Sequence, residues 1–315
     1  IARRASEVTP FLAMEVMERA KELEAAGREV IYLCLGEPDF PTPEPIVNTA
    51  VQALRAGQTT YTHSLGRIEL REAIADYYRR RYRVEVEPEQ VIVSSGTSPL
   101  MLLLFATLLD DGDEVILSDP SYACYPNFIR FVGGKPHFLR TRPEQGFQPQ
   151  AADVASAMTP RTRALLINSP SNPTGSVLSP AELEALAELP IPVVSDEIYH
   201  GLTYEGEERS ILEFSPDSFV LGGFSKAYAM TGWRLGWLVA PPDVVPEIDK
   251  LAQNLFLAAP TLAQYAALTA FEPENIAILE ERREAFRQRR DYLLRALREI
   301  YLKPFEIAMR RAKPW

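Results

Sequence analysis

Six short runs rich in Val, Ile and Leu constrain the fold of this 315-residue chain more than any other feature. They begin near residues 91, 114, 164, 192, 219 and 235, and stretches with helical spacing separate most of them. Strands that are apolar on both faces occur in sheets covered on both sides, and alternation with helices favours parallel pairing. We therefore expect an α/β fold in which a mainly parallel sheet lies between two layers of helices.

The segments on either side of these runs predict a division into domains. Residues 11–26 have apolar side chains at helical spacing and are followed by Gly27, which suits a helix end. The stretch GEPDFPTPEP, which begins at Gly36, can continue neither a helix nor a β-ladder. We predict an N-terminal arm at 1–35, a large domain at 36–272, and at 273–315 an incomplete remainder of the small domain to which the arm belongs.

Charge and cysteine content exclude several classes of function. The formal net charge of −10 disfavours a nucleic-acid or anionic-membrane surface, because both need concentrated Lys and Arg. Cys34 and Cys124 lie far apart and form no CxxC pair, which favours a reducing, cytoplasmic setting. The histidines His63, His137 and His200 have no ligand spacing, so we expect no metal site. No stretch reaches the ~18 apolar residues of a membrane span.

The strongest chemical signal is GGFSKAYAMTGWRLGW, residues 222–237. Phosphate groups are commonly bound by a hydroxyl, an Arg fork and backbone N–H groups. Ser225 and Arg234 supply the first two, and Lys226 places a reactive amine beside them. Each residue alone would more often be an ordinary surface side chain. Their combined spacing favours a phosphate site next to a functional lysine.

Three more apolar runs end in polar residues of interest. Asp196 ends the run at 192, and a carboxylate buried there needs a cationic partner, although a helix N-cap is the simpler alternative. Asn172 lies in INSPSNPTG, which could be only a turn-rich loop. In SSGTSP, Gly96 precedes Thr97 and Ser98 at a predicted helix start, where free N–H groups favour an anion.

These motifs together resemble those of the class I and II aminotransferases. SK-x(7)-R followed by Leu and Gly is similar to the family's lysine signature, and SDEIY and NPTG match its other motifs. The resemblance covers most of the chain. It implies the fold-type I architecture of pyridoxal-phosphate enzymes, with Lys226 covalently carrying pyridoxal 5'-phosphate and Ser225 and Arg234 binding its phosphate. Many relatives have a further Ser where this chain has Gly223, so one phosphate hydroxyl would be missing.

The resemblance also implies roles for the remaining candidates. Asp196 would pair with the protonated ring nitrogen and Tyr199 would donate to the ring hydroxyl, while Asn172 would contact both the ring oxygen and the substrate carboxylate. The other implied contacts are the phosphate cradle at Gly96, Thr97 and Ser98, an aromatic ring from Tyr122 against the cofactor, the backbone of Gly36 near the substrate carboxylate, and Tyr61 reaching the partner's site in a homodimer.

The implied activity is transfer of an amino group from an L-amino acid to a 2-oxo acid by a ping-pong mechanism, with Lys226 also moving the substrate proton. A β-lyase or a cyclopropane-forming synthase would use the same cofactor site and stays an alternative. A non-catalytic regulatory domain that binds the cofactor is less favoured, because no basic helix-turn-helix segment precedes residue 11. A dehydrogenase is disfavoured because no dinucleotide fingerprint follows a strand.

Two departures from the family pattern lead to further predictions. Several aspartate-preferring relatives carry a lysine where this chain has Ser98 and then Pro99, so we expect neutral or aromatic amino acids to rival aspartate as donors. The family's small-domain strands, with the arginine that binds the substrate α-carboxylate, are not visible in the sequence. We predict that a segment containing this arginine is hidden between about Glu299 and Glu306.

Overall fold

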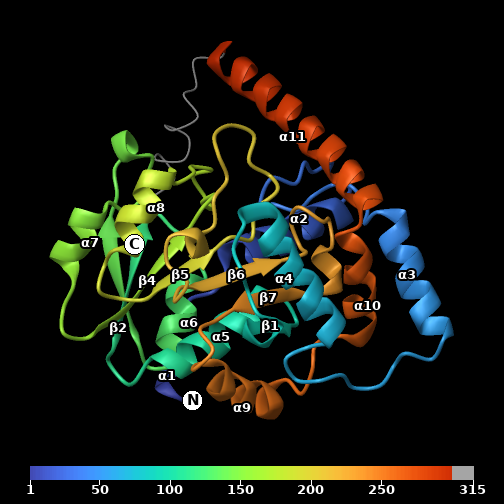
Figure 1. Cartoon of the computed structure of the whole chain (residues 1–315). Coiled ribbons are helices and arrows are strands. Elements are labelled where there is room, and N and C mark those ends of the chain that lie inside the picture. Colours follow the sequence, from blue (N-terminus) through green and yellow to red (C-terminus); the bar gives the residue numbers. More distant parts are fainter. Residues whose placement is uncertain (300–315) are drawn as a thin grey trace.

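The computed structural model describes residues 1–299, and the centre of this region is a seven-stranded sheet (Figure 1). The strand order is β1-β7-β6-β5-β4-β2-β3. The strands are β1 (Val91–Ser94), β2 (Glu114–Asp119), β3 (Lys135–Arg140), β4 (Thr162–Asn168), β5 (Val193–Asp196), β6 (Phe219–Gly223) and β7 (Gly236–Val239). Strands β2 to β6 pair in parallel, whereas β7 is antiparallel to both of its neighbours. The predicted mainly parallel sheet is confirmed.

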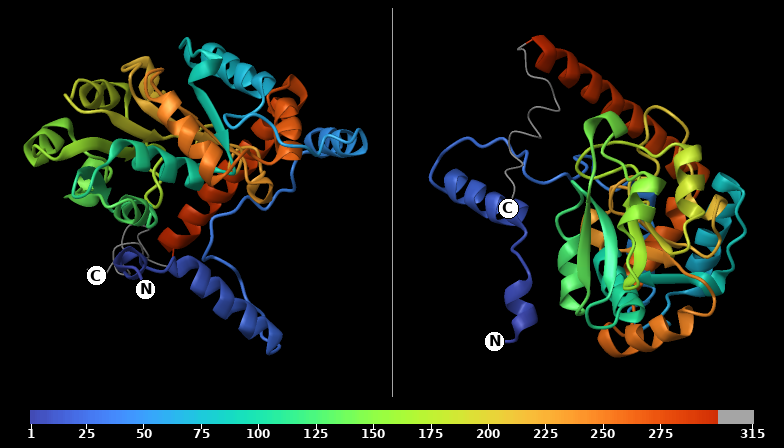
Figure 2. Two further views of the ribbon diagram at one scale, coloured as in Figure 1. Left: turned by 90° about the horizontal axis from the view of Figure 1, so that it is seen from below. Right: turned by 90° about the vertical axis from the view of Figure 1, so that its left-hand side faces the viewer.

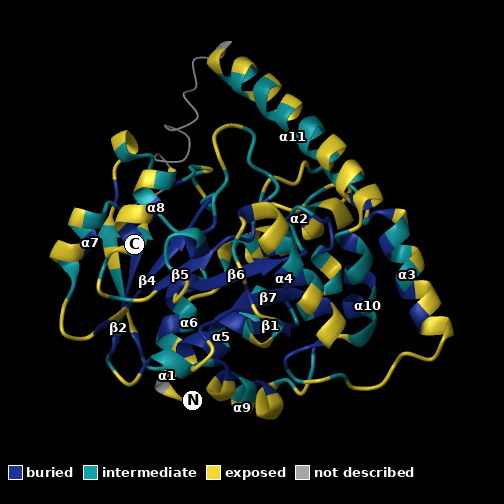
Figure 3. Ribbon diagram, in the orientation of Figure 1, coloured by how far each residue is buried: buried dark blue, intermediate teal, exposed yellow. Residues whose placement is uncertain are grey.

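Helices cover both faces of this sheet. Side chains on β4 alternate between the two faces, with Ala164 and Leu166 in one buried cluster and Leu165 and Ile167 in the other. The cluster that holds Leu166 is completed by α5, α6 and α9, and the opposite cluster by α3, α4, α7, α8 and α10. Burial on both faces is the reason why the strands read as continuous apolar runs. Figure 3 shows them as the buried centre of the molecule.

The α-helices have the following bounds: α1 (Arg3–Glu7), α2 (Leu12–Ala25), α3 (Glu44–Arg55), α4 (Ile68–Tyr82), α5 (Thr97–Leu108), α6 (Tyr125–Phe131), α7 (Ala151–Ala157), α8 (Pro180–Ala187), α9 (Val245–Leu255), α10 (Thr261–Ala270) and α11 (Pro273–Glu299). Helix α2 agrees with the helix predicted at 11–26, and Gly27 follows it with φ +83°. Helix α1 was not predicted.

The reversed strand β7 brings three parts of the chain together at one point. Gly236, its first residue, pairs with Ser94 at the end of β1 and with Gly223 at the end of β6. A Cβ atom on Gly236 would lie 3.0 Å from the carbonyl carbon of Gly96 and from the backbone nitrogen of Thr97. Only glycine permits so close an approach of the three backbones.

Strand β3 was not predicted from the sequence, because it is an edge strand with partly exposed side chains and contains Pro136, which lacks a backbone N–H. Residues 30–35 form neither a helix nor a strand, and Ile31 and Leu33 are 81% and 91% exposed there.

The two ends of the described region lie at the periphery (Figure 2). Helix α2 projects away from the sheet layers, and the segment before it is attached to α6 by hydrogen bonds between Thr9 and Asn127. The segment predicted to be hidden between Glu299 and Glu306, with its carboxylate-binding arginine, lies outside the described residues apart from Glu299 itself. Among residues 1–299, no helix has both the length and the apolar character needed to span a membrane.

Candidate active site

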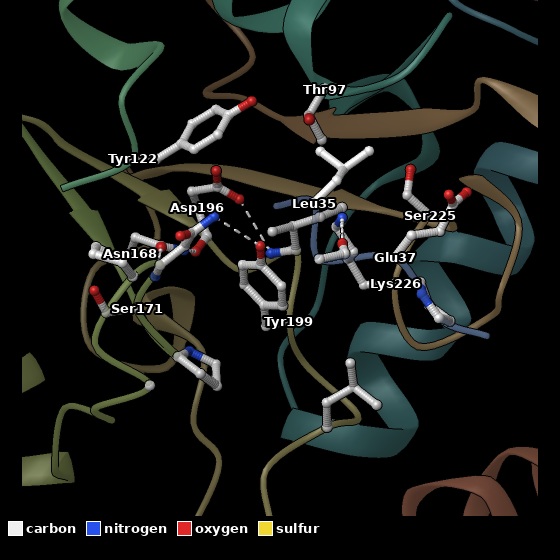
Figure 4. Close-up of a pocket in the computed structure, with 18 of the residues that line it drawn as sticks. Leu35, Glu37, Thr97, Tyr122, Asn168, Ser171, Asp196, Tyr199, Ser225 and Lys226 are labelled. Carbon is white, nitrogen blue, oxygen red and sulfur yellow. Dashed lines mark hydrogen bonds between the residues drawn. The ribbon is translucent and has the colours of Figure 1, made fainter. Parts of the chain in front are cut away.

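A cavity of about 1260 Å³ lies where the parallel strands end, and it contains most of the candidate residues (Figure 4). Its wall includes residues at or just after the ends of β1, β4, β5 and β6, which is where α/β sheets usually bind ligands. The candidates that line it are Gly36, Thr97, Ser98, Tyr122, Asn172, Asp196, Tyr199, Ser225, Lys226 and Arg234.

Two candidates lie outside this lining. Gly96 is adjacent to the lining, since it precedes Thr97 and a Cβ atom at this position would lie 2.9 Å from the Arg234 guanidinium. Tyr61 does not line the cavity and is 82% exposed. The structure therefore brings together every candidate except Tyr61, for which a site in a partner subunit was predicted.

Lys226 follows β6 and extends its amine into the cavity. Its Nζ donates a hydrogen bond to the carbonyl oxygen of Gly36 at 2.8 Å. Burial lowers the pKa of Lys226, and the charge of Arg234 lowers it further, whereas Glu37 opposes the shift. A lowered pKa makes the neutral, nucleophilic amine more accessible near neutral pH.

Asp196 ends β5 and is only 4% exposed. Its carboxylate accepts hydrogen bonds from the Tyr125 hydroxyl at 2.7 Å and from the Ile198 N–H at 3.1 Å, both neutral donors. Burial raises the pKa of Asp196 to about 6. A carboxylate in these surroundings would be stabilised by a cation, and the side of Asp196 that lines the cavity can receive one.

Asn168, which the sequence motifs did not identify, links two of the candidates. Its side-chain amide donates to the backbone carbonyl of Asp196 at 2.8 Å, and its Oδ1 accepts from the N–H of Asn172 at 2.6 Å. Asn172 in turn donates to the Tyr199 hydroxyl at 3.1 Å. These hydrogen bonds connect the end of β4 with the end of β5 and with the loop that contains Asn172.

The other end of the cavity is suited to an anion. Helix α5 begins there after Gly96, whose backbone has φ +96°, and no side chain among residues 1–299 caps its first N–H groups. The guanidinium of Arg234 lies beside this helix start, and Thr97, Ser98 and Ser225 line the same wall. Uncapped N–H groups, a helix dipole, hydroxyls and a guanidinium are the groups with which proteins commonly bind a phosphate.

Gly223 occupies the position at which the resemblance predicts a missing phosphate hydroxyl. A Cβ atom there would lie 2.7 Å from Cδ1 of Ile198 and 3.4 Å from the Cα of Gly236. A side chain at this position would therefore require the tip of the Ile198 side chain to move, while its contact with β7 would be an ordinary one.

The donor set of the cavity matches pyridoxal phosphate from end to end. A buried carboxylate suits a protonated ring nitrogen, an amine lies between the two ends, and the α5 cradle suits a phosphate (Figure 4). In the figure, Tyr122 and Asp196 are on one side of the cavity, and Ser225 and Lys226 are on the other.

Comparison with known proteins identifies relatives along nearly the whole chain. The family model for aminotransferase class I and II matches residues 28–309. The aspartate/prephenate aminotransferase of Thermus thermophilus is 41% identical over 310 residues, which cover 96% of this chain and 80% of that protein. A (5-formylfuran-3-yl)methyl phosphate transaminase of Methanocaldococcus jannaschii is 40% identical over 95% of this chain and 80% of its own length.

Solved structures give the same result. The aspartate aminotransferase of Thermus thermophilus with maleate superposes with a TM-score of 0.93 at 41% identity, covering 96% of this chain and 81% of that one. An aminotransferase from Mycobacterium tuberculosis gives 0.92 at 38% identity, with 95% and 79% covered. The chain therefore belongs to the class I and II aminotransferases, the pyridoxal-phosphate-dependent enzymes that transfer amino groups.

Proposed function

We propose that this transaminase binds pyridoxal 5'-phosphate in the cavity at the carboxyl ends of β1, β4, β5 and β6. The observation that supports this most strongly is the position of Lys226 in the same cavity as the buried carboxylate of Asp196 and the anion cradle at α5. Asp196 would hold the ring nitrogen, Asn172 and Tyr199 the ring oxygen, and Tyr122 one ring face. Gly96, Thr97, Ser98, Ser225 and Arg234 would hold the phosphate.

When bound, pyridoxal phosphate supplies an electron sink that makes the substrate Cα–H acidic. The protein residues supply the remainder of the chemistry. Ionised Asp196 keeps the ring nitrogen protonated, and the phosphate cradle fixes the other end of the ring. Lys226, with its lowered pKa, would carry the cofactor until the substrate amine takes its place in the bond, and the released Nζ would then accept the Cα proton. The carbonyl of Gly36, which accepts from Nζ, gives the amine a defined resting orientation.

We propose that the substrates are L-amino acids and 2-oxo acids. The names of the relatives refer to aspartate, prephenate and a furan-derived phosphate, which are substrates of different chemical kinds. Aromatic and apolar side chains also line this cavity, among them Phe11, Leu35 and Phe286, and the first of these contacts the ring of Tyr122. This lining supports the prediction that neutral or aromatic amino acids rival aspartate as donors.

We further propose a homodimer in which Tyr61 reaches the phosphate in the partner's site. The 82% exposure of its side chain supports a role outside its own subunit. The two free cysteines support a reducing, cytoplasmic setting.

The substitution Lys226→Ala tests the proposed function. The purified wild-type protein should have a visible absorption band from the cofactor, and borohydride reduction should attach the cofactor to the peptide containing Lys226. The variant should lose the visible band and transamination while its thermal unfolding stays cooperative. Lys250→Ala, which removes an exposed lysine paired with Glu247, is the matched control and should keep both properties. Near-normal turnover by Lys226→Ala would refute the assignment.

Product analysis separates the proposed reaction from a β-lyase. A panel of amino-acid donors with 2-oxoglutarate should form glutamate, whereas a β-lyase would form pyruvate and ammonia. A clear preference for aspartate over all neutral and aromatic donors would overturn the prediction about the donor.

A further inference from the structure

Tyr125 makes a contact that no motif of the sequence assigned to it. It is the first residue of α6 and is 2% exposed, and its hydroxyl donates to Asp196 Oδ2 at 2.7 Å. The other carboxylate oxygen of Asp196, Oδ1, accepts the N–H of Ile198. The two donors come from different elements, α6 and the loop after β5, and together they fix the plane of the carboxylate. No other side chain in the described part of the chain donates a hydrogen bond to this carboxylate.

We propose that Tyr125 is a positioning residue that orients the carboxylate of Asp196 toward the cofactor ring nitrogen and stabilises its ionised form. This inference rests on the proposed function, because the nitrogen it concerns belongs to pyridoxal phosphate. Tyr125 lines the same cavity but acts through Asp196.

The properties of both side chains support this role. Burial, and then the charge of Asp196, raise the pKa of Tyr125 well above its ordinary value, so its hydroxyl stays protonated and can only donate to the carboxylate. Burial raises the pKa of Asp196, and the bond from Tyr125 is the largest effect that opposes this rise. A hydrogen bond to a charged acceptor is stronger than one to a neutral acceptor.

The other titratable groups around Asp196 are unchanged when Tyr125 alone is substituted. Glu197 raises and His200 lowers the pKa of Asp196 from its own loop, while the charge of Asp196 acts on one further group of this loop and on groups of two other segments. These groups are Tyr122 before α6, Tyr199 after β5, and Lys226 after β6. A difference between wild type and a Tyr125 variant can therefore be attributed to the missing hydroxyl.

The test is Tyr125→Phe in the cofactor-free protein, titrated with pyridoxamine 5'-phosphate at a series of pH values. This probe has the ring nitrogen and the phosphate but forms no covalent bond with Lys226. Loss of the hydroxyl should raise the pKa of Asp196 above about 6. If the rise is about one unit, binding should weaken roughly ninefold near pH 5 and hardly change near pH 8, because Asp196 is ionised in both proteins at the higher pH.

The matched control is Tyr78→Phe. Tyr78 is 1% exposed, and its hydroxyl accepts from Trp237 Nε1 at 3.1 Å, so this variant also loses one buried hydroxyl hydrogen bond. It should change the dissociation constant of the probe by the same small factor at every pH. Combining Tyr125→Phe with Asp196→Asn should add less than about a twofold effect, because the carboxylate on which Tyr125 acts is gone.

Each outcome bears on the inference. A pH-dependent loss that vanishes in the Asp196→Asn background would support it. A loss that is independent of pH, or that persists in that background, would overturn the role of Tyr125 and leave the proposed function intact. Failure of the wild-type protein to bind the probe at any pH would overturn both.

Discussion

Gly96 offers the most direct test of the phosphate cradle. Its backbone, with φ +96° and ψ 177°, lies in a region that side chains avoid, and Gly96→Ala should cost about 1–3 kcal/mol of folding free energy. The new Cβ atom would also lie 2.9 Å from Nη2 and 3.4 Å from Cζ of Arg234. Because the guanidinium ends a flexible side chain, it should move away from the start of α5 rather than block folding.

The displaced guanidinium should weaken binding of the phosphate. Loss of one charge-assisted hydrogen bond corresponds to about 1.5–3 kcal/mol, or roughly a tenfold or greater loss of affinity. The assay is titration of the cofactor-free protein with pyridoxal 5'-phosphate and, separately, with pyridoxal, which lacks the phosphate but keeps the ring and aldehyde. The loss should be confined to the phosphorylated compound.

Gly206→Ala provides the control for backbone strain. Gly206 also has a positive φ, +83°, but a Cβ atom there meets nothing within 4 Å. This variant should lose stability in urea denaturation without a change in either affinity. If Gly96→Ala weakened pyridoxal and pyridoxal 5'-phosphate equally, the position assigned to the phosphate would be wrong.

Two further predictions concern the buried groups near the ring. Asn168→Ala should lower the free energy of unfolding by about 2 kcal/mol and weaken cofactor binding, because it removes the hydrogen-bond partners of backbone groups of Asp196 and Asn172. The control variant Asn127→Ala should leave cofactor binding unchanged, and equal effects of the two variants on binding would contradict the role of Asn168. The folded pKa of Asp196 is raised to about 6, so ionising it destabilises the cofactor-free protein increasingly between about pH 4 and pH 6. Asp196→Asn should therefore stabilise that form by about 3 kcal/mol at neutral pH, with the gain lost toward pH 4 in thermal unfolding, and a gain that grew on acidification would refute this.

The strands that could be predicted from the sequence are those that are buried on both faces. Their unbroken apolar side chains, as in β4 and β5, are a direct consequence of helices on both sides. Strand β3 shares none of this signal because it lies at the edge, and its side chains are partly exposed.

The same distinction applies to the candidate site. Residues that take part in local motifs, such as Lys226 and Asp196, could be placed in one cavity in advance because strand ends converge. Tyr125 and Asn168 carry no comparable signal. Both contact Asp196, which is remote from each in sequence, 71 positions from Tyr125 and 28 from Asn168. Such contacts depend on how α6 packs and on the pairing of β4 with β5, and neither can be predicted from the spacing of residues in the sequence.

The reversal of β7 also determines where the chain can tolerate added residues. Because β7 runs antiparallel to β6, the connection from Gly223 to Gly236 stays at the carboxyl end of β6 and needs no crossover helix. Lys226 and Arg234 both lie in this short connection, so an insertion there would change the spacing of two proposed cofactor contacts at once. The connection from β4 to β5 instead crosses the sheet through α8. Residues added between α8 and β5 would lengthen a loop at the amino end of β5, on the side of the sheet away from the cavity, and we expect the site to be unaffected by them.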